Sequence, residues 1–318
     1  MPRYLFYANG GEKVGMGHLF RIKNLIENLS IKNESKVLYR NNTQKNFFSK
    51  RGFVTHPLDD LLKNIEFDYF FLDTKEDLST EIKKLHLPKE KLFIIDNYTD
   101  TRFYCKTEIY PSYYFSNDVD SINSKRILKG HNYCILDKNY FSLSHKKKED
   151  RNKVLISFGG EDPNNLTLKC ISLLRDEEIL EKIVIVLGPN YKHDQNLLEK
   201  YVSKKNILKD PKNLETLFSE SIFVITSLGV TIQELFKVNT PFILIENYLE
   251  DRKEEKDIKK SNDKFMGPNF CYFCGFYKDL NKDKLKEGIQ IIKKYDFSPN
   301  ISLEEVGKGW SKENLGIN

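Results

Sequence analysis

Short apolar runs alternate with segments of helical periodicity, and this alternation constrains the fold more than any other feature of the sequence. In the first half the apolar runs are RYLFY, SKVLYR, FDYFFLD and KLFIIDN. Between them apolar residues recur at helical spacing, as Ile22, Leu25, Ile26 and Leu29 do. The alternation predicts a parallel β-sheet covered by helices on both faces.

The same alternation restarts in the second half, after the charged stretch SHKKKEDRNK, which we interpret as a solvated linker. The strands expected here are KVLISF, KIVIVLG, KNILKD, IFVITS and, as the last one, PFILIEN. We therefore predict an α/β protein with two Rossmann-like domains, 1–145 and 152–318, facing each other across a cleft. The helix expected from Leu280 onward is a candidate to cross back to the first domain. The region 98–141 has too little periodicity for its elements to be assigned.

Length and composition agree with this fold class and exclude others. The chain has 318 residues, 39% of them hydrophobic, which is enough for two cores. Its 51 basic and 46 acidic residues are interspersed, which argues against a surface for duplex nucleic acid. No apolar run is long enough to span a membrane and no export signal is apparent, so we expect a cytoplasmic location. The oligomeric state cannot be predicted.

The five cysteines do not suggest a disulfide framework, because their number is odd and no export signal accompanies them. Cys271 and Cys274 form one C-x-x-C, and no second pair of ligands for zinc is near. We interpret them as two buried or half-buried thiols.

Three loops share one construction, in which an apolar strand runs into glycine and then into a helix. Glycine lets the backbone approach a ligand, and the free N–H groups at a helix start attract anions, so each loop can hold phosphate. An ordinary tight connection between strand and helix is the alternative for any one of them. Together they favour a diphosphate ligand, and the small residues that carry the pattern are Gly15 and Gly17, Gly159 and Gly160, and Ser227 and Gly229.

Dinucleotide-dependent redox chemistry and phosphoryl transfer by a P-loop are both disfavoured, because the motifs of these two classes are missing. The loops match neither G-x-G-x-x-G with a later acidic residue nor G-x-x-x-x-G-K-[ST]. The only clustered carboxylates of interest, in LDD at Leu58 to Asp60, are expected away from a strand end, so no metal or other cofactor is predicted. Asp73 and Asp96 do end strands, and ligands bind outside such ends, although each could equally cap the next turn.

The segments VGMGHLFRIKNL, ISFGGEDPNNLT and ITSLGVTIQELF resemble the motif regions of a known enzyme family. This family is the UDP-2,4-diacetamido-2,4,6-trideoxy-β-L-altropyranose hydrolases of pseudaminic acid biosynthesis. The similarity extends to FLD, IIDN and YCILDKNYF, and thus over most of the chain. It implies the GT-B architecture of glycosyltransferases such as the lipid II N-acetylglucosaminyltransferase, and release of UDP and free sugar.

The resemblance also implies roles for individual residues. His18 occupies the place of the family's histidine that assists attack of water at the anomeric carbon, and imidazole suits that task because it titrates near neutral pH. Glu234 would accept hydrogen bonds from ribose, unless it is an ordinary surface acid. The diphosphate would be held by the turn formed by Ser227, Leu228, Gly229, Val230 and Thr231.

The sequence departs from the family at two expected sugar contacts. YANGGEK, with Asn9, replaces an Arg-x-Asp segment after the first strand, and Asn247 with Tyr248 replaces Asn-Gln after the last strand. Our candidates for residues near the sugar are Asn9, Asn247, Tyr248, Asp73 and Asp96. The charged segment 249–264 that follows is expected to be an exposed helix, with a mobile lid as the alternative.

The leading hypothesis is hydrolysis of a UDP-linked amino sugar as a step of nonulosonic acid or surface glycan biosynthesis. In this reaction His18 deprotonates the attacking water. The chief alternative is a GT-B glycosyltransferase, in which His18 activates the hydroxyl of a glycan, lipid or protein acceptor. A catalytically silent protein that binds a sugar nucleotide is the third possibility.

Overall fold

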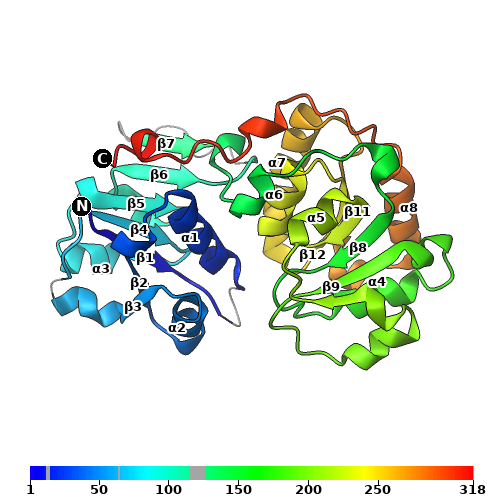
Figure 1. Ribbon diagram of the computed structural model, residues 1–318, viewed down its shortest axis with the longest axis horizontal. Coiled ribbons are helices and arrows are strands. Elements are labelled where there is room, and N and C mark those ends of the chain that lie inside the picture. The colour runs from blue at the N-terminus through cyan, green and yellow to red at the C-terminus, as the bar shows by residue number, and fades with distance from the viewer. Residues whose placement is uncertain (12–14, 64, 115–125, 318) are drawn as a thin grey trace. The chain divides into compact units, whose positions relative to one another are not determined.

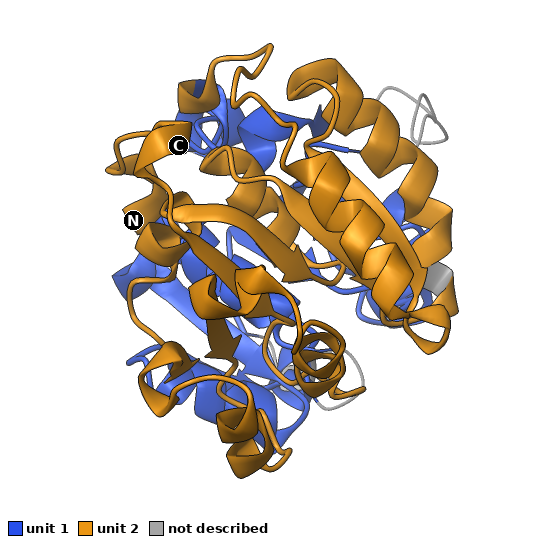
Figure 2. Ribbon diagram, turned by 90° about the vertical axis from the view of Figure 1, so that its right-hand side faces the viewer, with its two compact units in different colours: residues 1–138, 305–318 blue, residues 139–304 orange. Residues whose placement is uncertain are grey.

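The computed structural model describes residues 1–11, 15–63, 65–114 and 126–317. The chain forms two compact units, shown in different colours in Figure 2. Unit 1 contains residues 1–138 and 305–318, and unit 2 contains residues 139–304. Each unit is built around one β-sheet whose described strand pairs are all parallel, as the alternation of strands and helices predicts (Figure 1).

The sheet of unit 1 has seven strands in the order β3-β2-β1-β4-β5-β6-β7. The four strands expected from the sequence are confirmed, and β3, β6 and β7 are additional. Two of these come from the region without clear periodicity. The strands are β1 Tyr4–Ala8, β2 Ser35–Tyr39, β3 Val54–Pro57, β4 Tyr69–Asp73, β5 Leu92–Ile95, β6 Thr107–Tyr110 and β7 Arg126–Lys129, and the helices are α1 Gly17–Asn28, α2 Asn42–Ser49, α3 Ser79–Lys84 and α9 Lys312–Leu315.

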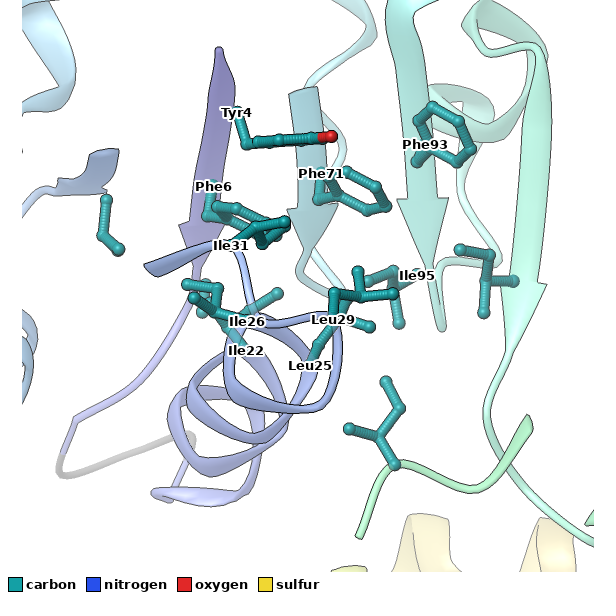
Figure 3. Close-up of a cluster of buried hydrophobic side chains, with 14 of the residues drawn as sticks. Tyr4, Phe6, Ile22, Leu25, Ile26, Leu29, Ile31, Phe71, Phe93 and Ile95 are labelled. Atoms are coloured by element: carbon teal, nitrogen blue, oxygen red, sulfur yellow. The ribbon is translucent and has the colours of Figure 1, made fainter. Parts of the chain in front are cut away.

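Helix α1 supplies much of the core on one face of this sheet. Its residues Ile22, Leu25 and Ile26 are fully buried, and Figure 3 shows them lying over Phe6 and Phe71 of the central strands. Burial of each such aliphatic side chain contributes about 1.5–3 kcal/mol relative to exposure. The helical spacing of these residues therefore fixes which side of α1 faces the sheet, and hence where its first turn lies.

The sheet of unit 2 has six strands in the order β10-β9-β8-β11-β12-β13. The segment PFILIEN forms β12, but it is not the last strand as expected. A further strand, β13, pairs with β12 and forms the edge of the sheet. A half-buried strand with a register shift and a left-handed Gly275 shows little alternation, so this edge strand was missed. The elements are β8 Lys153–Ser157, β9 Ile183–Leu187, β10 Ile207–Lys209, β11 Ser221–Thr226, β12 Phe242–Glu246 and β13 Cys271–Phe276, with helices α4 Leu166–Leu173, α5 Leu214–Ser219, α6 Val230–Lys237, α7 Arg252–Phe265 and α8 Lys282–Ile292.

Two predictions about unit 2 are confirmed. The charged segment forms α7, whose described side chains are mostly exposed or half-buried. Cys271 is half-buried and Cys274 is buried, both as free thiols. Among the described residues, no helix has the length and apolarity needed to cross a membrane.

The linker was interpreted as solvated, and this is wrong at its end. The Arg151 side chain is buried and donates hydrogen bonds to the carbonyls of Ser221 and Val238, each at 3.1 Å, and to Oγ1 of Thr240 at 2.6 Å. Burial lowers the pKa of Arg151 to about 10. The five N–H donors of a guanidinium allow backbone carbonyls to stabilise it in place of a carboxylate.

The chain does return to unit 1, but not by the expected helix. Leu285 and Ile289 of α8 belong to the core of unit 2. The returning segment is 305–318, which places Trp310, Leu315 and Ile317 in the core of unit 1. The Trp310 indole also donates a hydrogen bond to the carbonyl of Cys134 at 3.1 Å. Unit 1 is thus completed by the last residues of the sequence.

Replacement of Leu315 by alanine should lower the free energy of unfolding by about 2–5 kcal/mol, because it leaves a cavity in the core of unit 1. Urea denaturation followed by fluorescence would measure the change. Leu249→Ala is the matched control, since that leucine is 56% exposed. Equal small effects of both substitutions would contradict the packing of the returning segment.

Candidate functional site

The candidate catalytic residues of unit 1 gather where three neighbouring strands end. Ala8 at the end of β1 lies opposite Asp73 at the end of β4, which in turn lies opposite Ile95 at the end of β5. Helix α1 follows β1, so its first turn lies at the same edge. Parallel pairing therefore brings His18, Asp73 and Asp96 together from three separate parts of the sequence.

A buried guanidinium joins these residues, and the sequence analysis missed it. Arg21 donates to both carboxylate oxygens of Asp73, from Nε at 3.0 Å and from NH2 at 2.7 Å. Its NH1 donates to Oδ2 of Asp96 at 2.8 Å. The spacing G-x-G-H-x-x-R could have indicated Arg21, because residues three apart in a helix share one face.

The imidazole of His18 is oriented by Asp73. Its Nδ1 lies 2.6 Å from Oδ1 of Asp73 and 2.7 Å from NH2 of Arg21. The charged carboxylate favours a proton on Nδ1, and with that tautomer the contact with Arg21 is not a hydrogen bond. Nε2 forms no hydrogen bond within the described parts of the chain and is not among their fully buried unpaired atoms. The side chain is 9% exposed. With the proton on Nδ1, Nε2 of the neutral imidazole is an acceptor that solvent can reach.

The charge of Asp73 is secured by its surroundings. Burial by itself would raise its pKa, but the adjacent Arg21 and His18 outweigh burial, so the pKa is lowered. Burial likewise opposes the charge of Arg21, yet Asp73 and Asp96 together raise its pKa. Asp73 is fully buried and contacts His18 and Arg21, so the structure supports a positioning role for it, while its predicted place near the sugar stays a prediction.

Asn9, another sugar candidate in unit 1, is occupied by internal hydrogen bonds. Its Nδ2 donates to Glu76 at 2.9 Å, and its Oδ1 accepts from the N–H of Gly10 at 2.8 Å. A side chain already bonded at both ends holds its loop in place. Gly15 and Gly17 flank the start of α1, where no side chain caps the helix.

The loop with Gly159 and Gly160, predicted as a phosphate site, leads into a helix start that a carboxylate occupies. Asp162 accepts hydrogen bonds from the N–H groups of Leu166 at 2.7 Å and Thr167 at 2.9 Å, so its own carboxylate occupies the start of α4. A Cβ on Gly188 would lie 2.2 Å from the Gly159 carbonyl oxygen. Gly188 thus serves the close packing of its loop against Gly159 and Gly160, and the start of α4 offers an incoming phosphate little.

The turn before α6 is an open helix start in unit 2. It follows β11, which lies between β8 and β12 in the sheet. Gly229 precedes the helix without a side-chain cap, and no acidic residue lies in the first turn. Ser227 is buried, Gly229 is exposed, and Glu234 is half-buried one turn into the helix, while Leu228, Val230 and Thr231 are also half-buried.

The predicted sugar contacts of unit 2 lie beside this turn. Asn164, from the loop after β8, donates to Oδ1 of Asn247 at 3.1 Å, so loops on both sides of β11 are tied together. Asn247 is buried, whereas Tyr248 is 50% exposed. Tyr248 is therefore the more accessible of the two candidates.

No group of side chains suited to hold a metal ion occurs among the residues described. Asp59 and Asp60 lie in a short 3₁₀ helix, Leu58–Lys63, that follows β3 directly. The expectation that they lie away from a strand end is therefore wrong, because β3 could not be recognised from the sequence.

Sequence comparison finds relatives of this chain at low identity. No family model matches the chain. It is 27% identical over 293 residues to the uncharacterized protein MJ1062 of Methanocaldococcus jannaschii, covering 82% of this chain and 59% of that protein. The chain thus spans about three-fifths of the length of that relative. It is 22% identical over 259 residues to the spore coat polysaccharide biosynthesis protein SpsG of Bacillus subtilis, covering 75% and 76% of the two chains.

Solved structures establish the fold. MurG of Acinetobacter baumannii matches with a TM-score of 0.61 at 11% identity, over 99% of this chain and 98% of MurG. UGT89C1 of Arabidopsis thaliana, solved with UDP, matches with a TM-score of 0.62 at 13% identity, over 97% and 93% of the chains. The calicheamicin glycosyltransferase CalG4 matches with a TM-score of 0.59 at 9% identity, over 100% and 95%. The chain has the GT-B fold predicted from its motifs, whereas the hydrolase family that they resemble stays a prediction.

Replacement of Asp73 by asparagine should destabilise the protein by about 3–5 kcal/mol at neutral pH, because it leaves Arg21 without its buried partner. A carboxyl with a lowered pKa stabilises the fold above its unfolded pKa of about 3.9, and this contribution is lost as the pH falls. The difference from the unchanged protein should therefore shrink below about pH 4. Urea denaturation across pH would measure it, with exposed Asp100→Asn as control; a gap independent of pH would contradict the assignment.

Proposed function

We propose that the chain is a nucleotide-sugar enzyme that transfers a sugar from a UDP-linked donor to an acceptor hydroxyl. The observation that carries this proposal is the Asp73–His18 pair, which favours a proton on Nδ1 and so makes the accessible Nε2 the acceptor. An imidazole held in this tautomer is a general base at neutral pH. The transferase is preferred over the hydrolase because the similar folds include named glycosyltransferases and one distant relative is named for polysaccharide biosynthesis.

In the proposed reaction, His18 removes the proton of the acceptor hydroxyl while the oxygen of that hydroxyl bonds to C1 of the sugar. The bond from C1 to the diphosphate oxygen breaks, and UDP leaves with the electron pair. The proton remains on Nε2, and the imidazolium is stabilised by Asp73 at 2.6 Å from Nδ1. Arg21 fixes Asp73 on both oxygens, so the base is held in one orientation.

The diphosphate would be bound at the start of α6 in unit 2. Its free N–H groups and the helix dipole stabilise the charge that develops on the leaving group. The start of α4 is already occupied by Asp162, which favours α6 within this unit. The uncapped start of α1, with Gly15 and Gly17, is the second candidate for a phosphate contact.

Hydrolysis of a UDP-linked amino sugar in nonulosonic acid biosynthesis is the second candidate function. The motif that contains His18 and Arg21 favours it, since this is where the chain resembles the hydrolase family. The base is suited to water as well as to an acceptor hydroxyl. The two functions differ in whether a sugar is released when no acceptor is present.

Replacement of His18 by asparagine should reduce turnover about 10²–10⁴-fold and leave UDP affinity nearly unchanged, because the general base is lost while the diphosphate contacts remain. The assay incubates the protein with a panel of UDP-linked sugars, with and without a mixture of glycan acceptors, and follows UDP and sugar by mass spectrometry. His193→Asn is the matched control, since that histidine lies in unit 2 and bonds to the carbonyl of Asp162.

Release of UDP only with acceptor would support transfer, and release of UDP with free sugar in its absence would support hydrolysis. UDP binding without any release would overturn both and indicate a silent binder. Full turnover by the His18 variant would overturn the role of the base.

Gly229→Asp should weaken UDP binding about tenfold or more, because the new carboxylate competes with the diphosphate for the start of α6. The same substitution should leave stability unchanged or raise it by a few tenths of a kcal/mol through capping. Gly229→Ala is the control, since a Cβ there meets nothing within 4 Å. Calorimetric titration with UDP and thermal denaturation would test the pair, and unchanged UDP affinity in the Asp variant would argue against this site.

A further inference from the structure

Asp96 has the most exposed side chain of the buried cluster that it forms with His18, Arg21 and Asp73. Its side chain is 17% exposed, compared with 0% for Asp73 and 6% for Arg21. Oδ2 accepts from Arg21 at 2.8 Å, while Oδ1 forms no hydrogen bond with any described residue. One carboxylate oxygen is therefore anchored and the other is available.

The position of Asp96 is held from two sides. Its N–H donates to the carbonyl of Ile109 on the neighbouring strand at 2.8 Å, and its backbone is left-handed with φ of 53°. Asparagine and aspartate tolerate this conformation better than other residues that have a Cβ. The free oxygen is thus presented from a fixed backbone.

The charge of the cluster determines what can bind there. One guanidinium, Arg21, faces the two carboxylates of Asp73 and Asp96, so the cluster has an excess of one negative charge while His18 is neutral. Nε2 of His18 and Oδ1 of Asp96 are both acceptors, and Arg21 lies beside both residues, with NH1 bonded to Asp96 at 2.8 Å and NH2 2.7 Å from Nδ1 of His18. An anionic group beside Oδ1 of Asp96 is repelled, whereas hydroxyl and ammonium groups are attracted there.

We propose that Asp96 selects the acceptor by accepting a hydrogen bond from a second hydroxyl or an ammonium group near the hydroxyl that reacts at His18. The acceptor is then a polyhydroxylated or amino-sugar compound that is not anionic at this position. This inference rests on the proposed role of His18 as the base.

The test uses three probes, methyl glucosides that carry an ammonium, a hydroxyl or a carboxylate group at C6. Binding is followed by NMR through the imidazole signals, with the His18 signal among the six histidines identified by its loss in His18→Asn. The ammonium and hydroxyl probes should shift the His18 signal at lower concentration than the carboxylate probe.

Asp96→Asn should weaken binding of the ammonium and hydroxyl probes about tenfold or more and leave binding of the carboxylate probe no weaker. The reason is that Asn can still accept a hydrogen bond from Arg21 but presents an N–H group to the ligand. Asp137→Asn is the matched control, since Asp137 also pairs with a cation of α1, Lys23, at 2.6 Å. The control should preserve the order of the probes.

Three results would overturn the inference: binding of the carboxylate probe as tight as that of the other two, an unchanged order of probe affinities in the Asp96 variant, or no shift of the His18 signal with any probe. A separate titration with UDP distinguishes this failure from that of the proposed function. UDP binding with an acceptor-dependent release of UDP, but without the expected order of probes, would leave the function standing and remove only the role of Asp96.

Discussion

The buried guanidinium of Arg21 is the interaction on which the candidate site of unit 1 depends. It connects helix α1 with the ends of β4 and β5 through hydrogen bonds to Asp73 and Asp96. Charges taken out of water are costly, and here their mutual attraction and several hydrogen bonds offset that cost. Loss of either partner leaves an uncompensated charge, so the cluster holds three elements in one arrangement and orients His18 at the same time.

The two units use one plan to collect polar residues. In each, parallel strands place the following loops at one edge of the sheet, and helices begin there. The helix starts then differ in what occupies them. Asp162 fills the start of α4, whereas the start of α6 has no side-chain cap. This difference, rather than the presence of glycine, separates a structural turn from a candidate for binding diphosphate.

Much of the fold and part of the site could be predicted from the sequence. His18 and the turn before α6 were found because strand, glycine and helix follow each other within a few residues. Arg21 was missed because its partner Asp73 is 52 positions away. The buried role of Asp73 and the internal bonds of Asn9 were missed for the same reason, since no local pattern records which strands become neighbours.

The sequence by itself determined two parallel α/β sheets, because the spacing of apolar residues is a local property that each strand and helix must satisfy. Only the tertiary structure decided that residues 305–318 complete the core of unit 1, that β13 extends the sheet of unit 2, and that Asp73 lies beneath His18 while Asp96 keeps one oxygen available. These outcomes depend on burial and on pairing between distant residues. Such interactions exist only once the chain has folded.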